Sequence, residues 1–289
     1  MIRLKVPAKI NLYLRLTGKR VDGFNDICTV FQKIAFYDSL EAKKINKGCL
    51  IEIKGMSPCS TKDNLIYKAY QTIKKKAKFK GGVKFSLEKN IPFGAGLGGA
   101  SADAAYALFA INKLYKLRFT QAELTELAKP LGADVALFLY KDSRMLGLEK
   151  GDVLLPLSKG PKLWVLLVVM EEKLSTADVY KAFRYNKRQI SLTTISSEVI
   201  ILSQSISRCE MSDLAKVMHN DLMRPAKKIM PVIGKNLNKM KKSGLSAVLM
   251  TGSGSTLFAL FKDKKDAQQA AEKLDLYNVR NLIVCQTLD

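Results

Sequence analysis

Residues 89–105 read Lys89-Asn90-Ile91-Pro92-Phe93-Gly94-Ala95-Gly96-Leu97-Gly98-Gly99-Ala100-Ser101-Ala102-Asp103-Ala104-Ala105, and this stretch decides the fold. Before it, apolar and polar residues alternate from Val83 to Glu88, which predicts a β-strand. This strand should end at Pro92, because proline cannot donate a hydrogen bond to a sheet. After the glycines, apolar residues recur at helical spacing, which predicts a helix from Ser101 to about Leu114.

The glycine-rich turn between this strand and helix has the properties of a phosphate-binding loop. Its four glycines, Gly94, Gly96, Gly98 and Gly99, let the backbone approach an anion without a side-chain clash. The helix that follows directs unpaired N–H groups and the positive end of its dipole toward the turn. Ser101 adds a hydroxyl that could contact a phosphate oxygen or a bound Mg²⁺. The favoured interpretation is a nucleotide-phosphate loop.

Three alternatives compete with this interpretation. Gly94, Gly96 and Gly99 match the spacing of a dinucleotide-binding fingerprint, but a bare match is weak and no acidic residue ends a strand about 20 positions later. A Walker A loop fails because no Gly-Lys-Ser/Thr follows. A structural turn without a ligand is the third, and four glycines in six residues make it entropically costly.

The other segments predict an α+β protein with two lobes. The 289 residues are many for one compact core, and 47% are hydrophobic, which is ample for folding. Strands and helices are mixed without regular βαβ alternation. The lobes are expected at residues 1–156 and 157–289. Strands are predicted at Ile2–Val6, Leu163–Met170, Ala247–Met250 and Thr256–Phe261, and helices from Thr120, which begins a capping box, at 176–184 and at 210–243.

The charge of the chain is strongly positive, with 48 Lys and Arg against 26 Asp and Glu, a formal +22. Nucleic-acid binding is one explanation. A lysine-rich solvated surface is favoured, because the lysines are spread in short groups and no arginine-rich arm, zinc-finger spacing or aromatic RNA-binding stretch accompanies them. No nucleic-acid partner is therefore expected.

The sequence favours a bacterial cytoplasmic location. The longest apolar run, Leu163–Met170, is too short to span a bilayer, and no charged-then-apolar leader precedes the first strand. The scattered cysteines are expected to be reduced thiols without a metal site; they are Cys28, Cys49, Cys59, Cys209 and Cys285.

Pro92 followed by Gly96-Leu97-Gly98-Gly99-Ala100-Ser101 resembles the phosphate-loop signature of the GHMP kinases. Further motifs resemble the branch of that family that phosphorylates 4-diphosphocytidyl-2-C-methyl-D-erythritol. They follow in the same order over nearly the whole chain: Pro7–Leu14, Asp22–Phe24, Thr29–Gln32, Leu131–Val135, Ser175–Tyr180, Asn220–Leu222 and Met250–Ser255. The resemblance implies the two-lobed GHMP kinase fold, with an N-terminal lobe like domain 2 of ribosomal protein S5 and a GHMP C-terminal lobe.

The resemblance implies three residues at the reaction centre. Asp134 would be the general base for the substrate hydroxyl, although a helix N-cap would also explain it. Lys9 would orient Asp134 or screen the transferring phosphoryl group; a solvent-facing strand lysine is the alternative. Asn11, two residues on, lies on the same strand face and would place the substrate.

The resemblance also assigns residues to the two ligands. For ATP these are Asn64 and Leu65 near the adenine, Lys89 and Pro92, and the loop itself: Gly94, Ala95, Gly96, Leu97, Gly98, Gly99, Ala100, Ser101 and Ala102. Asn64 could equally be a helix cap. Thr176 would contact the substrate or cap a helix. Gly252 and Gly254 would form a tight turn beneath the phosphate loop, or simply a hairpin.

The chain departs from the family pattern at the base-binding motif. After Asp22-Gly23 the family carries Tyr-His-Glu, whereas this chain has Phe24-Asn25-Asp26. Phe24 can still stack on a cytosine ring, and Asn25 still offers a donor and an acceptor in place of the histidine. The second serine of the loop is Ala102, and neither this change nor Ala136, where proline is usual, removes a required catalytic group.

The sequence thus predicts an ATP-dependent kinase for a small alcohol, with Mg²⁺ bridging the β- and γ-phosphates. The expected acceptor is the 2-hydroxyl of 4-diphosphocytidyl-2-C-methyl-D-erythritol. A homoserine- or mevalonate-like kinase and a catalytically silent polyanion-binding protein are the alternatives. The protein is expected to act as a monomer or weak homodimer.

Overall fold

The computed structural model describes residues 1–54, 63–185 and 191–289. These residues form two compact units that interleave along the sequence, because β1 (Ile2–Lys19) and β2 (Asn25–Ile45) each contribute to both. Because the two units alternate along the chain, neither corresponds to one predicted lobe. The division into lobes at residue 156 therefore stays a prediction. Unit 1 comprises Met1–Ala8, Phe36–Pro92 and Gly98–Lys141; unit 2 comprises Lys9–Ala35, Phe93–Leu97 and Asp142–Asp289.

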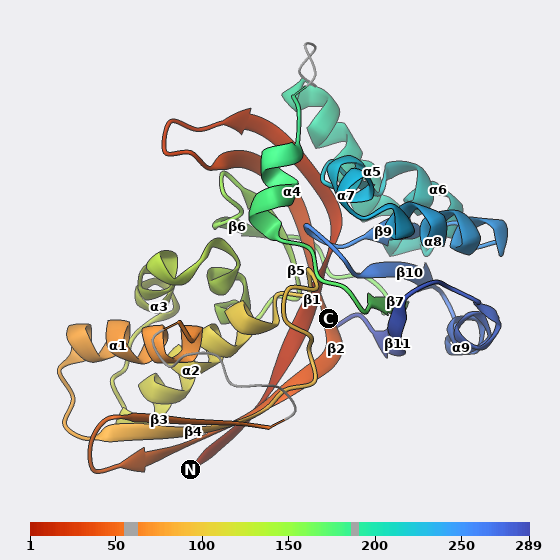
Figure 1. The fold of residues 1–289 in the computed structure, drawn as a ribbon. Helices are drawn as coiled ribbons and strands as arrows, with labels where there is room; N and C mark the ends of the chain where they lie inside the picture. The colour runs from red at the N-terminus through yellow and green to blue at the C-terminus, as the bar shows by residue number, and fades with distance from the viewer. Residues whose placement is uncertain (55–62, 186–190) are drawn as a thin grey trace. The chain divides into compact units, whose positions relative to one another are not determined.

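Unit 1 is a small sheet covered by helices. β4 (Gly82–Glu88) pairs antiparallel with the end of β2 and parallel with β3 (Cys49–Lys54). The alternating side chains of β4 bury Val83, Phe85 and Leu87, as the sequence pattern predicts. Figure 1 shows α1 and α2 together over β3 and β4. The helical segments are α1 (Leu65–Ala77), α2 (Gly99–Tyr115), α3 (Gln121–Ala128), η1 (Lys129–Leu131) and η2 (Ala133–Leu139).

The helix after the glycine loop, α2, begins at Gly99, two residues before the predicted start. Its N-cap is Gly98 in the left-handed region at φ 72°, a conformation that glycine adopts without strain. Ala102, Ala104 and Ala105 are buried, so small side chains let this helix pack closely. The predicted capping box at Thr120 is confirmed at the start of α3.

Unit 2 contains a four-stranded sheet whose neighbouring strands are all antiparallel. Its order is β11 (Val279–Gln286), β7 (Trp164–Met170), β10 (Leu257–Phe261) and β9 (Val248–Met250). Every residue of β7 after Trp164 is buried, which confirms the predicted buried strand. In the same unit β2 pairs with β5 (Arg144–Leu148), β5 pairs with β6 (Val153–Pro156), and β1 pairs with β8 (His219–Asn220).

The helices of unit 2 correct one prediction. Residues 210–243 are not helical throughout but form three separate helices, because Asn220 pairs with Leu14 in β8 and Pro231 starts a new helix at its first turn. The apolar faces of the last two of these helices join the buried side of the four-stranded sheet. The helices are α4 (Thr176–Ala182), α5 (Leu192–Arg208), α6 (Met211–Val217), α7 (Met223–Ile229), α8 (Pro231–Lys242) and α9 (Lys264–Lys273).

Candidate active site

The first half of the glycine loop belongs to unit 2 and lies against the turn between β9 and β10. Gly96 has φ 76°, and a Cβ atom there would come within 2.3 Å of the Thr251 carbonyl oxygen and 3.1 Å of the Gly254 carbonyl oxygen. The backbone N–H of Lys9 donates to the Leu97 carbonyl at 3.0 Å. Two features therefore favour glycine at position 96: the positive φ angle, and the short distance to the backbone of the β9–β10 turn.

Substituting Gly96 with alanine should raise the KM for ATP at least about tenfold, because the added methyl forces the loop away from the β9–β10 turn. Gly94→Ala is the matched control, since Gly94 also has a positive φ of 69° but a Cβ there meets only the flexible side chain of Lys173, at 3.6 Å. Steady-state kinetics on both variants would check this. If the two variants had equal KM values for ATP, the close approach of Gly96 to the β9–β10 turn would not be the cause of the increase.

The second half of the loop belongs to unit 1 and opens α2. The backbone N–H of Ala102 donates to the Gly98 carbonyl at 2.9 Å, so the N–H groups of the preceding first-turn residues have no acceptor within the helix. The first turn of α2 carries no acidic residue that would neutralise the helix dipole. Pro92, Ala100 and Ser101 are half-buried. This end of α2 has the donors that a phosphate group needs.

Lys89 lies beneath this helix start in a buried ion-pair cluster. Its side chain has no exposed surface, and its Nζ donates to Asp38 and, at 2.8 Å, to Asp103. A Cβ on Gly99 would lie 3.0 Å from the same Nζ. Sequence reasoning assigned Lys89 to ATP. The structure places it in this buried cluster, and its role toward ATP stays a prediction.

The two acids of the cluster differ in their hydrogen bonds. Asp38 also accepts from the backbone N–H groups of Asn90, at 2.6 Å, and Ile91, at 2.8 Å. Asp103 Oδ1 is buried, and no residue in the described ranges lies within hydrogen-bonding distance of it. Burial, opposed by Lys89 and reinforced by Asp38, raises the pKa of Asp103 to about 7. Asp103 therefore holds a proton more readily than an ordinary aspartate does.

Lys9 and Asn11 lie on the same face of β1, as predicted. Lys9 is 4% exposed, which excludes the alternative of a solvent-facing lysine, and its Nζ donates to Asn11 Oδ1 at 2.7 Å. Asn11 Nδ2 donates to Thr29 Oγ1 at 2.8 Å, which fixes the amide. Thr251 Oγ1 accepts from the Asn11 backbone N–H at 3.0 Å. The lysine is thus held by a buried polar network in unit 2.

The β9–β10 turn completes this network, and two of its supports were missed by sequence reasoning. Thr251, fully buried, also donates to the Gly96 carbonyl at 3.2 Å, so it joins β1 to the glycine loop. Asn220 Nδ2 donates to the carbonyls of Met250, at 2.7 Å, and Gly252, at 2.8 Å. A Cβ on Gly252 would lie 3.4 Å from Lys9 Nζ. Thr251 and Asn220 both lie inside recognised motifs, but their sequence neighbours do not show what they contact.

The structure shows the local contacts of three other predicted residues, whose roles toward the ligands stay predictions. Asp134 is half-buried in the first turn of η2, whose N-cap is Gly132, so Asp134 is not the cap. Asn64 is the N-cap of α1, with Oδ1 accepting from the Ile66 N–H at 2.9 Å, and Leu65 begins that helix. Ser175 caps α4, whereas Thr176 Oγ1 lies 2.8 Å from Ser253 Oγ.

The loop between β1 and β2 carries the departures from the family pattern. Phe24 is 58% exposed, with Lys150 Nζ 5.4 Å from its ring centroid, so one ring face can receive a planar ligand. Asn25 is half-buried, and its Oδ1 accepts a hydrogen bond from the hydroxyl of Tyr185 at 2.7 Å. Arg20 pairs with Asp26 at 2.7 Å and holds the two ends of the loop together.

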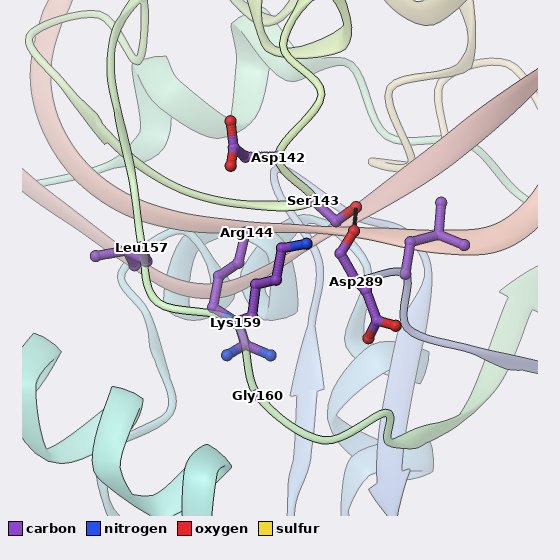
Figure 2. Close-up of a pocket in the computed structure, with 8 residues that line it drawn as sticks. Asp142, Ser143, Arg144, Leu157, Lys159, Gly160 and Asp289 are labelled. Atoms are coloured by element: carbon purple, nitrogen blue, oxygen red, sulfur yellow. Dashed lines mark hydrogen bonds between the residues drawn. The ribbon is translucent and has the colours of Figure 1, made fainter.

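A small hollow of unit 2 contains none of the predicted site residues. Figure 2 shows it lined by Arg144, Lys159 and Asp289, with Ser143 donating to the Asp289 backbone carbonyl at 2.6 Å. The Arg144 guanidinium is occupied by Gln32 Oε1, at 2.8 Å, and the Ser158 carbonyl, at 3.3 Å. This hollow is a packing feature near the chain end and adds no group to the candidate site.

No set of three or more His, Cys, Asp or Glu in the described ranges could hold a metal ion. None of the described helices is both long and apolar enough to cross a membrane. The described cysteines, Cys28, Cys49, Cys209 and Cys285, are free thiols, and Cys59 lies outside the described residues.

Two family models match the chain: the GHMP kinases N terminal domain at residues 64–142 and the GHMP kinases C terminal domain at residues 207–279. The 4-diphosphocytidyl-2-C-methyl-D-erythritol kinase of Syntrophus aciditrophicus is 35% identical over 271 residues, covering 93% of each chain. The chain belongs to the 4-diphosphocytidyl-2-C-methyl-D-erythritol kinase family. The Desulfotalea psychrophila kinase of the same name is 36% identical, over 90% of this chain and 86% of the relative.

Solved structures agree with this family. A crystal structure of 4-(cytidine 5'-diphospho)-2C-methyl-D-erythritol kinase matches with a TM-score of 0.84 and 30% identity, covering 100% of both chains. The homoserine kinase of Cytophaga hutchinsonii matches with a TM-score of 0.75 and 19% identity, over 99% of this chain and 94% of that one, and shows the shared fold. The predicted family, the α+β GHMP fold and a small-molecule kinase are confirmed. The roles of individual residues stay predictions.

Proposed function

We propose that this protein transfers the γ-phosphoryl group of ATP to the 2-hydroxyl of 4-diphosphocytidyl-2-C-methyl-D-erythritol, a step in the non-mevalonate route to isoprenoid precursors. The observation that carries the proposal is the 35% identity to a kinase of that name over 93% of the chain. This likeness extends over nearly the whole chain. It favours this acceptor over the homoserine- and mevalonate-like alternatives.

The buried network around Lys9 supports phosphoryl transfer. Phosphoryl transfer needs positioning, neutralisation of charge and an acceptor for the hydroxyl proton. Lys9 provides a cation whose position is fixed by Asn11 and, through it, Thr29. Asp134 provides a carboxylate at the start of an apolar segment and would accept the proton from the substrate hydroxyl. Asn11 and Thr176 would place the acceptor.

The glycine loop fits the triphosphate of ATP. The close approach of Gly96 to Thr251, the positive φ angles of Gly94, Gly96 and Gly98, and the open first turn of α2 leave backbone N–H groups for the phosphate oxygens. Asn64 and Leu65 would lie by the adenine. Mg²⁺ would be held mainly by the phosphates, with Ser101 as a protein contact, and would supply charge neutralisation.

A substrate panel tests the proposal. The purified protein is incubated with labelled ATP and Mg²⁺ and, in parallel, 4-diphosphocytidyl-2-C-methyl-D-erythritol, homoserine or mevalonate. Transfer to the first acceptor, with a kcat/KM at least about a hundredfold above the others, is expected. A preference for homoserine or mevalonate would refute the acceptor. Salt-dependent RNA binding without any turnover would favour the polyanion-binding alternative.

We further propose that the protein works in the cytoplasm, as a monomer or weak homodimer, with ATP and its small-molecule substrate as the only partners. The supply of ATP and the reduced state expected of its cysteines fit that compartment. The lysine-rich surface would add a favourable field for two anionic substrates.

A further inference from the structure

The first half of the glycine loop has its carbonyl groups paired and its N–H groups open. The carbonyls of Ala95, Gly96 and Leu97 accept hydrogen bonds from other segments of unit 2, at 3.4, 3.2 and 3.0 Å respectively. Among the described residues, none accepts a hydrogen bond from the N–H groups of Gly94, Ala95, Gly96 or Leu97. Successive open N–H groups in a turn form a concave site for an anion. The loop itself therefore offers donors to a phosphate group but no full positive charge.

Lys173 supplies such a charge beside Gly94. It lies in the segment that leads from β7 to α4 (Figure 1). A Cβ on Gly94 would lie 3.6 Å from the Cδ of Lys173, 3.8 Å from its Cβ and 3.9 Å from its Cγ, so the stem of the lysine runs along the loop. Lys173 is exposed, which leaves its ammonium group, two bonds beyond Cδ, in solvent.

The backbone on both sides of Lys173 is fixed to the β9–β10 turn. Ser255 Oγ donates to the Glu172 carbonyl at 2.6 Å. Leu174 is buried in the core of unit 2, and a Cβ on Gly254 would lie 3.1 Å from its Cδ1. The same turn contacts the glycine loop. The backbone of Lys173 is therefore held beside the loop independently of its own side chain.

The charge of Lys173 has no partner among the residues that the structure describes. Although Glu171 and Glu172 precede it directly, no ion pair joins Lys173 to either of them or to another described acid. An exposed lysine is usually a solvated surface charge. Lys173 differs from such a lysine because its stem lies along a loop whose N–H groups are open.

We propose that Lys173 is a binding residue for ATP, whose ammonium group contacts a phosphate oxygen of the triphosphate on the glycine loop. The inference rests on the proposed function in one respect, that this loop holds the triphosphate. It extends that function by naming a cation that comes from the segment before Thr176 and was missed by sequence reasoning. Because the cytidine substrate carries a diphosphate, the test must separate the two nucleotides.

Titration calorimetry of the full chain with ATP, and separately with cytidine 5′-diphosphate, tests the inference without turnover. Lys173→Met keeps an apolar stem beside Gly94 and removes the charge, so it should weaken ATP binding about tenfold. Its affinity for cytidine 5′-diphosphate should stay within about twofold of wild type. Lys173→Arg keeps the charge and should bind ATP within about threefold of wild type.

Lys262→Met is the matched control. Lys262 is another exposed lysine of unit 2, but it follows the end of β10 that lies away from the β9–β10 turn. The substitution removes the same single charge and should leave the affinity for ATP within about twofold of wild type. Raising the salt concentration should weaken ATP binding less in Lys173→Met than in wild type, because salt then has one contact fewer to screen.

Three results would overturn the inference: unchanged ATP affinity in Lys173→Met, an equal loss in Lys262→Met, or an equal loss in Lys173→Arg. A loss confined to cytidine 5′-diphosphate would also overturn it, since the lysine would then serve the other substrate. Wild-type protein that binds no ATP would refute the loop as a phosphate site and the inference with it. Failure of the proposed acceptor has a different signature: ATP binding would depend on Lys173, but no phosphoryl group would reach 4-diphosphocytidyl-2-C-methyl-D-erythritol.

Discussion

Replacing Asp134 with asparagine should lower kcat by a factor of about 10²–10⁴, the usual contribution of a positioned general base. Asparagine has nearly the same shape as aspartate but cannot take a proton from the substrate hydroxyl. The fold should tolerate the change, because Asp134 is half-buried and Gly132, not Asp134, is the N-cap of η2. The substitution should therefore lower kcat without unfolding the protein.

The measurement is kcat with 4-diphosphocytidyl-2-C-methyl-D-erythritol as acceptor, together with the melting temperature of the variant. Glu126→Gln is a suitable control, since it removes another carboxylate of unit 1, one whose ion pair with Lys129 is exposed. This control should keep its turnover. Turnover of Asp134→Asn within a factor of about two of wild type would remove Asp134 from the role of base.

The features that could be predicted from the sequence are those set by neighbouring residues. The glycine loop, the strand before it and the helix after it depend on residues 83–115, where periodicity and backbone freedom act locally. The capping box at Thr120 needs only Glu123. That Lys9 and Asn11 share a face of β1 followed from two-residue alternation, but the pattern left a buried and a solvent-facing Lys9 equally possible.

The features that were missed are set by contacts between distant residues. Asn11 and Thr251 are 240 positions apart, and nothing near either residue signals the hydrogen bond between them. Residues 210–243 have a helical pattern throughout, but pairing of Asn220 with β1 gives a strand there that no local preference shows. The buried ion pair between Lys89 and Asp38 likewise joins residues 51 positions apart, while the assignment of Lys89 to ATP, which the family resemblance implies, stays a prediction.

Replacing Lys89 with methionine should destabilise the protein by about 3–5 kcal/mol, the usual cost of leaving a buried charge without its partner. Lys89 has no exposed side-chain surface, and its removal leaves Asp38 and Asp103 facing each other. Lys84→Met is the matched control, because Lys84 lies in β4 and pairs with the largely exposed Glu52. That change should cost no more than about 1 kcal/mol. Urea denaturation of both variants would compare the two costs.

The free energy of unfolding should also depend on pH through Asp103. Burial raises the pKa of Asp103 to about 7, against about 3.9 in an unfolded chain. Between these values Asp103 holds a proton in the folded protein that it releases in the unfolded chain, so the contribution of Asp103 to stability is greatest below about pH 4 and falls as the pH rises toward 7.

Asp103→Asn should abolish this decline and make the protein more stable than wild type at pH 8, with the difference closing as the pH falls below 7. In the Lys89→Met background the same change should recover part of the lost stability, because one of the two unpaired carboxylates is gone. Strictly additive effects of the two substitutions on the free energy of unfolding would show that Asp103 does not share the buried charge of Lys89.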